Sequence, residues 1–240
     1  MNVPLLHIQG LKKSFDEVSV IDDLTLKIAP QTISLISGEN GAGKTTALNL
    51  ISGFEKVSAG KIIFDNRVIT NLSPLQRSKL GLARLFQTPR IFKNLVVWEN
   101  LVCSSQNNIG ENFLKLIFAP RKSKTQDNYL KEKAASILEK FGLRQLENRI
   151  SGELSYGQQK LISFCMLAMN GTKLGLLDEP FAGLNPKMID KISEMIVELR
   201  NNGVTFLMVE HNIQSALVIC KQHFIMKNGT LIEIGSEIRN

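Results

Sequence analysis

The sequence predicts an α/β fold with an N-terminal antiparallel β layer and an inserted helical subdomain. A glycine-rich loop at 38–46 follows a β-branched run, 32–37, and precedes a segment with the character of a helix. A second apolar run, 174–177, ends in two acids, and the stretch 103–149 between these regions is polar, basic and helical in its periodicity. Strands and helices that alternate on both sides of such a stretch are typical of a parallel sheet with an insertion.

The glycine-rich loop fits the pattern G-x-x-x-x-G-K-[ST] of a phosphate-binding loop, and its strand–loop–helix context fits as well. Glycines let backbone N–H groups turn toward an anion, and the helix N-terminus adds partial positive charge. We expect Lys44 to reach the β- and γ-phosphates of a nucleoside triphosphate and Thr45 to hold Mg²⁺ through its hydroxyl. The sequence thus predicts a P-loop NTPase core whose nucleotide-binding residues are Gly38, Glu39, Asn40, Gly41, Ala42, Gly43, Lys44, Thr45 and Thr46.

Composition limits the class of protein. The chain has 240 residues, 43% of them hydrophobic, and no apolar run approaches the roughly 20 residues of a membrane-spanning helix. The first residues lack the basic and apolar regions of a signal peptide. Cys103, Cys165 and Cys220 are far apart in apolar surroundings, so we expect buried, reduced thiols, which suit the cytosol.

The formal net charge is +7, which suits nucleic acid, anionic lipid headgroups or a polyphosphate ligand. The dense basic cluster at 121–124 has no interleaved aromatic residues. We interpret this cluster as a solvated loop and expect no nucleic-acid partner.

The first elements are strands. Segments 5–11 and 18–28 are strand-like, and the second alternates from Leu24 to Ile28, so one of its faces should be exposed. Phe15 is expected on the loop between them. An aromatic ring there can stack on a purine base or pack against the protein, and the spacing leaves both open.

The next segments lead to a polar loop. A hairpin is predicted at 61–69, turning at Asp65-Asn66, and Ser73-Pro74 should begin a short helix. A strand at 82–86 then ends at Gln87, on the edge of the sheet where α/β proteins place their ligands. Gln87 can therefore reach a metal or a water molecule, although a solvent-facing loop residue is the alternative.

The inserted stretch is predicted to be mostly helical. Segments 96–104 and 129–141 have helical periodicity, and Gly142 should end the second helix. Segment 154–159 then leads into a helix that runs to about Met169. Ser155 and Gly157 at its start predict another anion site, because helix N-termini bind anions. This surface has no nucleotide loop of its own, which predicts a dimer in which it closes over the partner's nucleotide.

The apolar run at 174–177 predicts a strand whose carboxyl end carries two candidate functional acids. Asp178 at its tip can hold Mg²⁺ opposite Thr45. Glu179 can take a proton from an attacking water molecule that is held in line with the γ-phosphate. The alternative is that both acids merely end the strand.

The last part continues the alternation of helices and strands. Asn185-Pro186 should cap a helix at 188–200, and 204–209 is another buried strand. His211 follows this strand and can donate to a γ-phosphate oxygen, or it can be structural. Asn228-Gly229 should turn a final hairpin between 225–227 and 230–234.

These motifs, in this order, resemble those of the ATP-binding cassette ATPases, the motor subunits of ABC transporters, over essentially the whole chain. The matching segments are the phosphate loop 38–46, the Q-loop glutamine Gln87, the LSGGQ signature 154–158, the second acidic motif 174–179, the D-loop 182–185 and the switch histidine His211. Three positions depart from the family pattern: Tyr156 replaces a signature glycine, Asn185 replaces the D-loop aspartate, and Phe15 stands where tyrosine often stacks on adenine.

The resemblance implies an ATPase that uses ATP and Mg²⁺. Glu179, His211, Gln87 and Lys44 are then the catalytic residues, Thr45, Gln87 and Asp178 the metal ligands, and Phe15 stacks on the base. Ser155, Gly157 and Gln158 contact the nucleotide of a second ATPase subunit, in a homodimer or a heterodimer. Residues 1–86 and 170–240 form the nucleotide-binding core with its antiparallel layer, and 87–169 form the Q-loop and helical subdomain.

The details are most similar to the ATPases of branched-chain amino acid importers, in the stretches 83–87, 154–159, 182–186 and 209–211. This implies transmembrane permease subunits, an indirect extracytoplasmic substrate-binding protein and a peripheral place on the cytoplasmic face of the inner membrane. Urea-importer and lipopolysaccharide-exporter ATPases share much of the pattern. A soluble ABC-type ATPase acting on nucleic acid or ribosomes and a small-molecule kinase remain as alternatives.

Overall fold

The computed structural model describes residues 3–105, 120–211 and 213–234, and it gives 120–127 as helix backbone alone. The chain forms two compact units, Met1–Gln87 with Lys173–Asn240, and Thr88–Thr172. The first unit contains the β-sheet, and the second contains helices.

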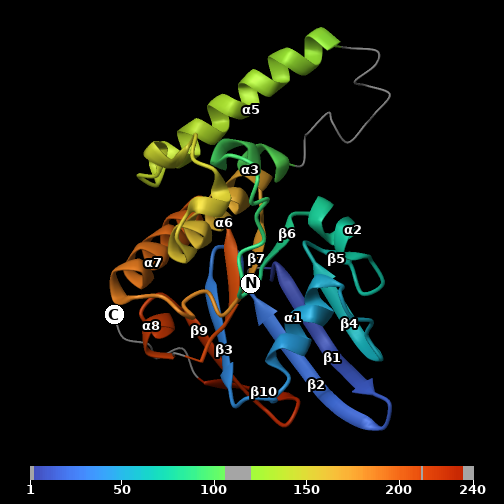
Figure 1. Ribbon diagram of the computed structural model, residues 1–240. Helices are drawn as coiled ribbons and strands as arrows, with labels where there is room; N and C mark the ends of the chain where they lie inside the picture. Colours follow the sequence, from blue (N-terminus) through green and yellow to red (C-terminus); the bar gives the residue numbers. More distant parts are fainter. Residues whose placement is uncertain (1–2, 106–119, 212, 235–240) are drawn as a thin grey trace. The chain divides into compact units, whose positions relative to one another are not determined.

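The first unit is built on a ten-stranded sheet in the order β5-β4-β1-β2-β10-β9-β3-β8-β7-β6 (Figure 1). The strands are β1 Leu6–Phe15, β2 Val18–Ile28, β3 Ile33–Gly38, β4 Ala59–Phe64, β5 Arg67–Val68, β6 Leu82–Leu85, β7 Leu174–Asp178, β8 Thr205–Val209, β9 Gln222–Lys227 and β10 Thr230–Ile234. Strands β5, β4, β1 and β2 pair antiparallel, whereas β9, β3, β8, β7 and β6 pair parallel. The predicted antiparallel layer and parallel core are thus confirmed.

Strand β2 shows the predicted alternation. Leu24, Leu26 and Ile28 are buried, and the residues between them are exposed. Phe15 was expected on a loop, but it is the last residue of β1 and pairs with Val18. The prediction was wrong because the turn between the strands is only two residues long, so both strands extend into the polar segment.

The parallel strands are covered on both faces. Strands β7 and β8 are buried along their whole length, as expected when helices lie on each side. Figure 1 shows α1 (Lys44–Ser52) and α7 (Pro186–Asn201) on opposite sides of these strands. Helix α7 begins as predicted, since the Asn185 side chain accepts a hydrogen bond from the Met188 N–H at 3.0 Å. The short α8 (Ile213–Leu217) was not predicted, because five residues carry too little periodicity.

Arg77, in helix α2 (Pro74–Lys79), supports the carboxyl end of α1. Its side chain is 1% exposed, and burial lowers its pKa to about 10, so it is charged at neutral pH. The last carbonyl groups of a helix have no partner within the helix. The Arg77 guanidinium donates to backbone oxygens of this helix end, Leu50 at 2.6 Å and Ile51 at 2.7 Å. It also donates to those of the loop that precedes α2, Thr70 at 2.8 Å and Leu72 at 2.9 Å.

Replacing Arg77 by methionine should therefore destabilise the protein. Each buried carbonyl left without a partner costs about 1–3 kcal/mol, and the added apolar contact offsets part of this, so we expect a loss of about 2–4 kcal/mol. Urea unfolding measures it. The matched variant Arg67→Met, at an exposed position of β5, should change the free energy of unfolding by less than about 0.5 kcal/mol. Equal effects of the two variants would contradict the capping role.

The second unit is a group of helices. Its described elements are α3 Val97–Cys103, α5 Pro120–Lys140, the 3₁₀ turns Arg144–Leu146 and Ser151–Glu153, and α6 Tyr156–Asn170. The helix predicted at 96–104 contains α3, and the helix predicted at 129–141 overlaps the second half of α5, which begins earlier than predicted. Asn100 is fully buried and donates to Ser151 Oγ at 2.9 Å, which fixes α3 against the turn that precedes α6.

One of the three thiols differs from its prediction. Cys165 and Cys220 are buried, but Cys103 is exposed. Cys103 is the last residue of α3, whereas the buried residues of this helix, Val97, Asn100 and Leu101, come before it. The basic cluster at 121–124 was expected on a loop, but its backbone belongs to helix α5, which begins at Pro120, well before the helix predicted at 129–141. The side chains of this cluster lie outside the described residues.

Candidate functional site

The phosphate loop needs glycine at its two ends. Gly38 has φ 151°, and a Cβ there would lie 2.3 Å from the carbonyl oxygen of Met226. Gly43 has φ 101°, and its Cβ would lie 2.8 Å from Ile21 Cδ1. Any larger residue at either position would push the loop away from β2 and β9, so these glycines let the loop close down on the sheet.

Lys44 is held against the loop from which it projects. The side chain is buried, and Nζ donates to the carbonyl oxygens of Gly38 and Glu39, both at 2.7 Å. Burial lowers the pKa of the Lys44 ammonium, and the carboxylate of Glu179 opposes this shift by raising it. The lysine therefore lies within the electrostatic reach of the second acidic motif.

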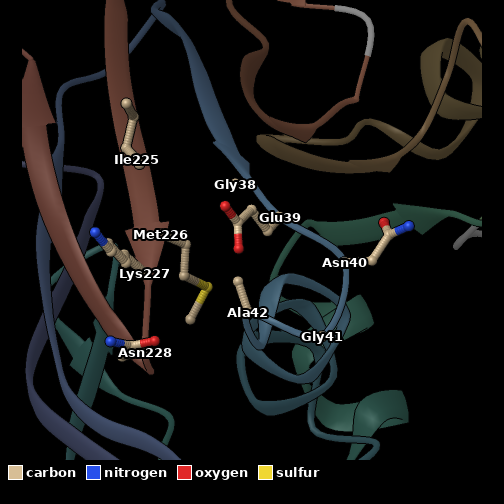
Figure 2. A pocket seen from close by; sticks show the side chains of 9 residues that line it. All are labelled: Gly38, Glu39, Asn40, Gly41, Ala42, Ile225, Met226, Lys227 and Asn228. Atoms are coloured by element: carbon tan, nitrogen blue, oxygen red, sulfur yellow. The ribbon is translucent and has the colours of Figure 1, made fainter.

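A pocket of about 270 Å³ lies beside this loop. Figure 2 shows the side chains of Glu39, Ala42 and Met226 facing the space between β9 and the loop, whereas Lys227 points away. The pocket is lined by Gly38, Glu39, Asn40, Gly41, Ala42, Ile225, Met226, Lys227 and Asn228. It lies at the carboxyl ends of β3 and β9, the edge at which open α/β sheets bind their ligands. Phe15 is not among its lining residues.

Glu179 is the centre of a polar cluster. Its Oε2 accepts a hydrogen bond from Gln87 Nε2 at 3.0 Å, and its Oε1 lies 3.1 Å from His211 Nε2. The three residues follow β6, β7 and β8, which are neighbouring parallel strands, so their side chains meet at one edge of the sheet. Glu179 has φ 49°, an unusual conformation for a residue with a side chain. The structure thus brings together three of the predicted catalytic residues.

Glu210, which sequence reasoning passed over, holds this cluster in place. It is 2% exposed. Its Oε1 accepts from the backbone N–H of Phe181 at 2.7 Å, and its Oε2 accepts from the N–H of His211 at 3.2 Å. Glu210 therefore ties the segment after Glu179 to the end of β8. The signal in the sequence is an acid that directly follows the apolar run 206–209.

Asp178, the last residue of β7, is also held by a residue that was not singled out. Its Oδ2 accepts from Arg84 at 2.7 Å, and the two side chains are 11% and 4% exposed. The visible signal is an arginine inside the apolar run 82–86.

The predicted metal ligands fit a magnesium ion by their chemistry. Mg²⁺ is usually bound by one or two carboxylates together with water and substrate phosphates. Asp178 offers a carboxylate, Thr45 an exposed hydroxyl on the first turn of α1, and Gln87 an amide oxygen. The part of the chain that the structure describes contains no cluster of three or more His, Cys, Asp or Glu side chains suited to a metal, so substrate oxygens would have to complete this set.

Phe15 remains accessible at the end of β1. Its ring is 42% exposed, and Lys13 Nζ lies 4.4 Å from the ring centroid. Lys13 is itself held by Glu55 Oε2 at 3.2 Å. A cation against one face leaves the other face of the ring for a planar base.

The predicted signature residues begin helix α6 in the second unit, so the structure does not place them relative to Lys44. Ser155 Oγ accepts from the N–H of Gln158 at 3.3 Å, and Gln158 Oε1 accepts from the N–H of Ser155 at 3.0 Å. This capping box satisfies two N–H groups of the helix start. Gly157 lies between them and is partly exposed.

Comparison with known proteins agrees with these motifs. A family model described as "ABC transporter" matches residues 21–182. The probable branched-chain amino acid transport ATP-binding protein LivG of Methanocaldococcus jannaschii is 36% identical over 239 residues, 98% of this chain and 92% of that protein. The high-affinity LivG protein of Escherichia coli K12 is 33% identical over 244 residues, 100% of this chain and 95% of its own length.

Solved structures agree as well. The crystal structure of a nucleotide-free ATP-binding cassette from an ABC transporter superposes with a TM-score of 0.83 at 34% identity, covering 98% of this chain and 92% of that one. Within the described residues, no helix has the length and apolar character to cross a membrane. The chain therefore belongs to the ABC transporter family, as an ATP-binding subunit that hydrolyses ATP.

Proposed function

We propose that this chain powers a membrane importer of branched-chain amino acids or a similar small polar solute. The relatives from M. jannaschii and E. coli are named for branched-chain amino acid transport and match the chain nearly end to end. The proposal places the chain on the cytoplasmic face of the cell membrane. Its partners there are transmembrane permease subunits and a second ATPase subunit, and an extracytoplasmic substrate-binding protein acts indirectly.

The observation that best supports the proposed reaction is the position of Glu179 between two polar side chains. Its Oε2 lies 3.0 Å from Gln87 Nε2, and its Oε1 lies 3.1 Å from His211 Nε2. We assign Glu179 as the general base. It accepts a proton from water as the water oxygen bonds to the γ-phosphorus, and the bond to the bridging oxygen breaks to release ADP. His211 and Gln87 fix the carboxylate, and Lys44 neutralises charge on the phosphates. Mg²⁺, bound through Thr45, Asp178 and Gln87, would supply further neutralisation of the phosphate charge.

We further propose that the hydrolytic site is shared between two copies of the chain. The phosphate loop belongs to the first unit, and Ser155, Gly157 and Gln158 at the start of α6 belong to the second. In a dimer, this helix start would cover the nucleotide held by the partner, and the unit Thr88–Thr172 would pass the closure on to the permease. Closure performs work only because ATP binds the closed state more tightly than the open one.

A test of the cargo uses the intact transporter. The chain is purified from detergent-solubilised membranes with its permease and placed in vesicles with the substrate-binding protein. Leucine, isoleucine or valine should stimulate ATP hydrolysis, and urea should not. Stimulation by urea, or co-purification with ribosomes in place of a permease, would overturn the proposal.

Phe15 should contribute to ATP affinity only through its contact with the adenine base. Stacking on an aromatic ring is worth about 1–3 kcal/mol per base, so Phe15→Ala should weaken ATP binding by about 5–150-fold. Phe15→Tyr keeps the ring and should bind ATP normally. Inorganic tripolyphosphate, which has no base, should bind all three proteins equally in calorimetry. Equal losses for ATP and tripolyphosphate would show that Phe15 shapes the loop instead of binding the base.

A further inference from the structure

Arg84 lies at the junction of the elements that carry the proposed metal ligands. It stands on β6, with its side chain 4% exposed. One guanidinium nitrogen donates to Asp178 Oδ2 at 2.7 Å. The other donates to Asn49 Oδ1 at 2.6 Å and to Ser52 Oγ at 3.3 Å. A single buried cation thus joins β6, the end of β7 and helix α1.

Each of the two principal partners of Arg84 is linked to a proposed metal ligand. Asp178 is itself the proposed carboxylate ligand. Asn49 stands four residues after Thr45 on α1, and residues spaced by four lie on the same face of a helix. Arg84 holds the Asn49 side chain, so it also holds the face of α1 that carries the Thr45 hydroxyl.

The guanidinium is suited to this task by its shape. It is planar, stays charged at neutral pH and offers its donors in a rigid fork, so two partners are fixed at once. Its plane is further fixed by Phe86, whose ring centroid lies 4.6 Å from Arg84 Cζ. Because Asp178 Oδ2 is bound by Arg84, Oδ1 is the oxygen that can face a cation.

We propose that Arg84 is a positioning residue for the magnesium ion of Mg-ATP, acting through Asp178 and through Asn49 on the helix of Thr45. The inference rests on the proposed function, since that function supplies the metal. A positive charge beside a carboxylate also repels a second cation. The orienting effect prevails, because loss of a residue that orients a metal ligand typically costs about 10–100-fold in metal affinity or activity.

The test separates metal binding from nucleotide binding. Arg84→Met keeps much of the length and volume of the side chain and removes the charge. In this variant the Mg²⁺ concentration that half-saturates ATP hydrolysis should rise by about 10–100-fold. The affinity for Mn²⁺ should fall by the same factor. It is measured by electron paramagnetic resonance on protein that is saturated with ATP and also carries the Glu179→Gln substitution. ATP affinity in EDTA should stay as in the parent protein.

Two further variants are expected to reduce the metal affinity less than Arg84→Met does. Arg84→Lys restores a charge without the fork and should recover only part of the metal affinity. Asn49→Ala should raise the half-saturating Mg²⁺ concentration less than Arg84→Met does. It also serves as the test variant should Arg84→Met fail to fold, as judged by thermal melting. Arg67→Met, on an exposed strand position, is the matched control and should match the parent.

The possible results have distinct meanings. Unchanged metal affinity in folded Arg84→Met, or in Asn49→Ala when that variant stands in, would overturn the inference. Tighter metal binding, or a loss of ATP affinity in EDTA as large as the loss for Mn²⁺, would overturn it too. A wild-type protein that hydrolyses ATP without any divalent cation would instead defeat the proposed function.

Discussion

Replacing Glu179 by glutamine is expected to lower ATP turnover by about 10²–10⁴-fold, the contribution of a well-placed general base. The amide has nearly the same shape as the carboxylate but cannot accept the proton of the attacking water. Gln87 Nε2 and His211 Nε2 lie 3.0 and 3.1 Å from the two carboxylate oxygens, so an amide still has a partner on each side. ATP affinity should therefore persist, and a closed dimer with trapped ATP should accumulate.

The matched control for this variant is Glu194→Gln, the same change at an exposed position of α7. It should hydrolyse ATP at the wild-type rate. Single-turnover measurements distinguish the proton-transfer step from product release. If Glu179→Gln hydrolysed ATP normally, the base would have to be another group, and the geometry around Glu179 would need a different explanation.

Replacing Lys44 by alanine should weaken ATP binding by about 10–150-fold. A hydrogen bond to a charged group is worth about 1.5–3 kcal/mol, which corresponds to this range of dissociation constants. Nζ donates at 2.7 Å to the carbonyl oxygens of Gly38 and Glu39. These contacts hold the ammonium at the loop before the phosphates arrive, so little side-chain order is lost when the nucleotide binds.

Isothermal titration with ATP in EDTA measures the effect of Lys44 without the metal. Lys61→Ala, at an exposed position of β4, removes a lysine of the same unit and should bind ATP as the parent protein does. Tripolyphosphate affinity should fall with ATP affinity in Lys44→Ala, in contrast to Phe15→Ala. An unchanged ATP affinity would show that the loop does not bind phosphate through its lysine.

The elements that were predictable from sequence are those with strong local signals. The phosphate loop, the Ser73-Pro74 helix start and the Asn228-Gly229 hairpin each depend on residues a few positions apart. The Gln87, Glu179 and His211 cluster was predictable for another reason. Each residue follows a recognisable strand, and parallel strands place their carboxyl ends at the same edge.

The residues that sequence reasoning missed act through distant partners. Arg84 meets Asp178 across 94 positions, and Glu210 meets the N–H of Phe181 across 29. Arg77 finds its carbonyl partners on α1, 26 and 27 positions away. A single polar residue in an apolar run signals that a buried partner exists, but only the packed structure identifies the partner. The same limit applies to Cys103, whose exposure depends on the neighbours of α3.

Asp178 illustrates why the unpredicted residues matter. From sequence it is an acid at a strand tip, and that position alone does not define the direction of its oxygens. In the structure, Arg84 takes Oδ2 at 2.7 Å and is in turn fixed by Asn49 at 2.6 Å. The orientation of the carboxylate that we propose as a metal ligand thus depends on Arg84 and, through it, on Asn49.

The shared site is tested most directly by mixing two inactive variants. Glu179→Gln keeps the helix start of α6 but lacks the base, and Gly157→Asp keeps the base but places an anion at that helix start. Each variant alone should hydrolyse ATP poorly. A mixed dimer contains one intact site, so the mixture should regain activity well above the sum of its parts. A mixture that shows only that sum would contradict the proposal that two chains enclose each ATP.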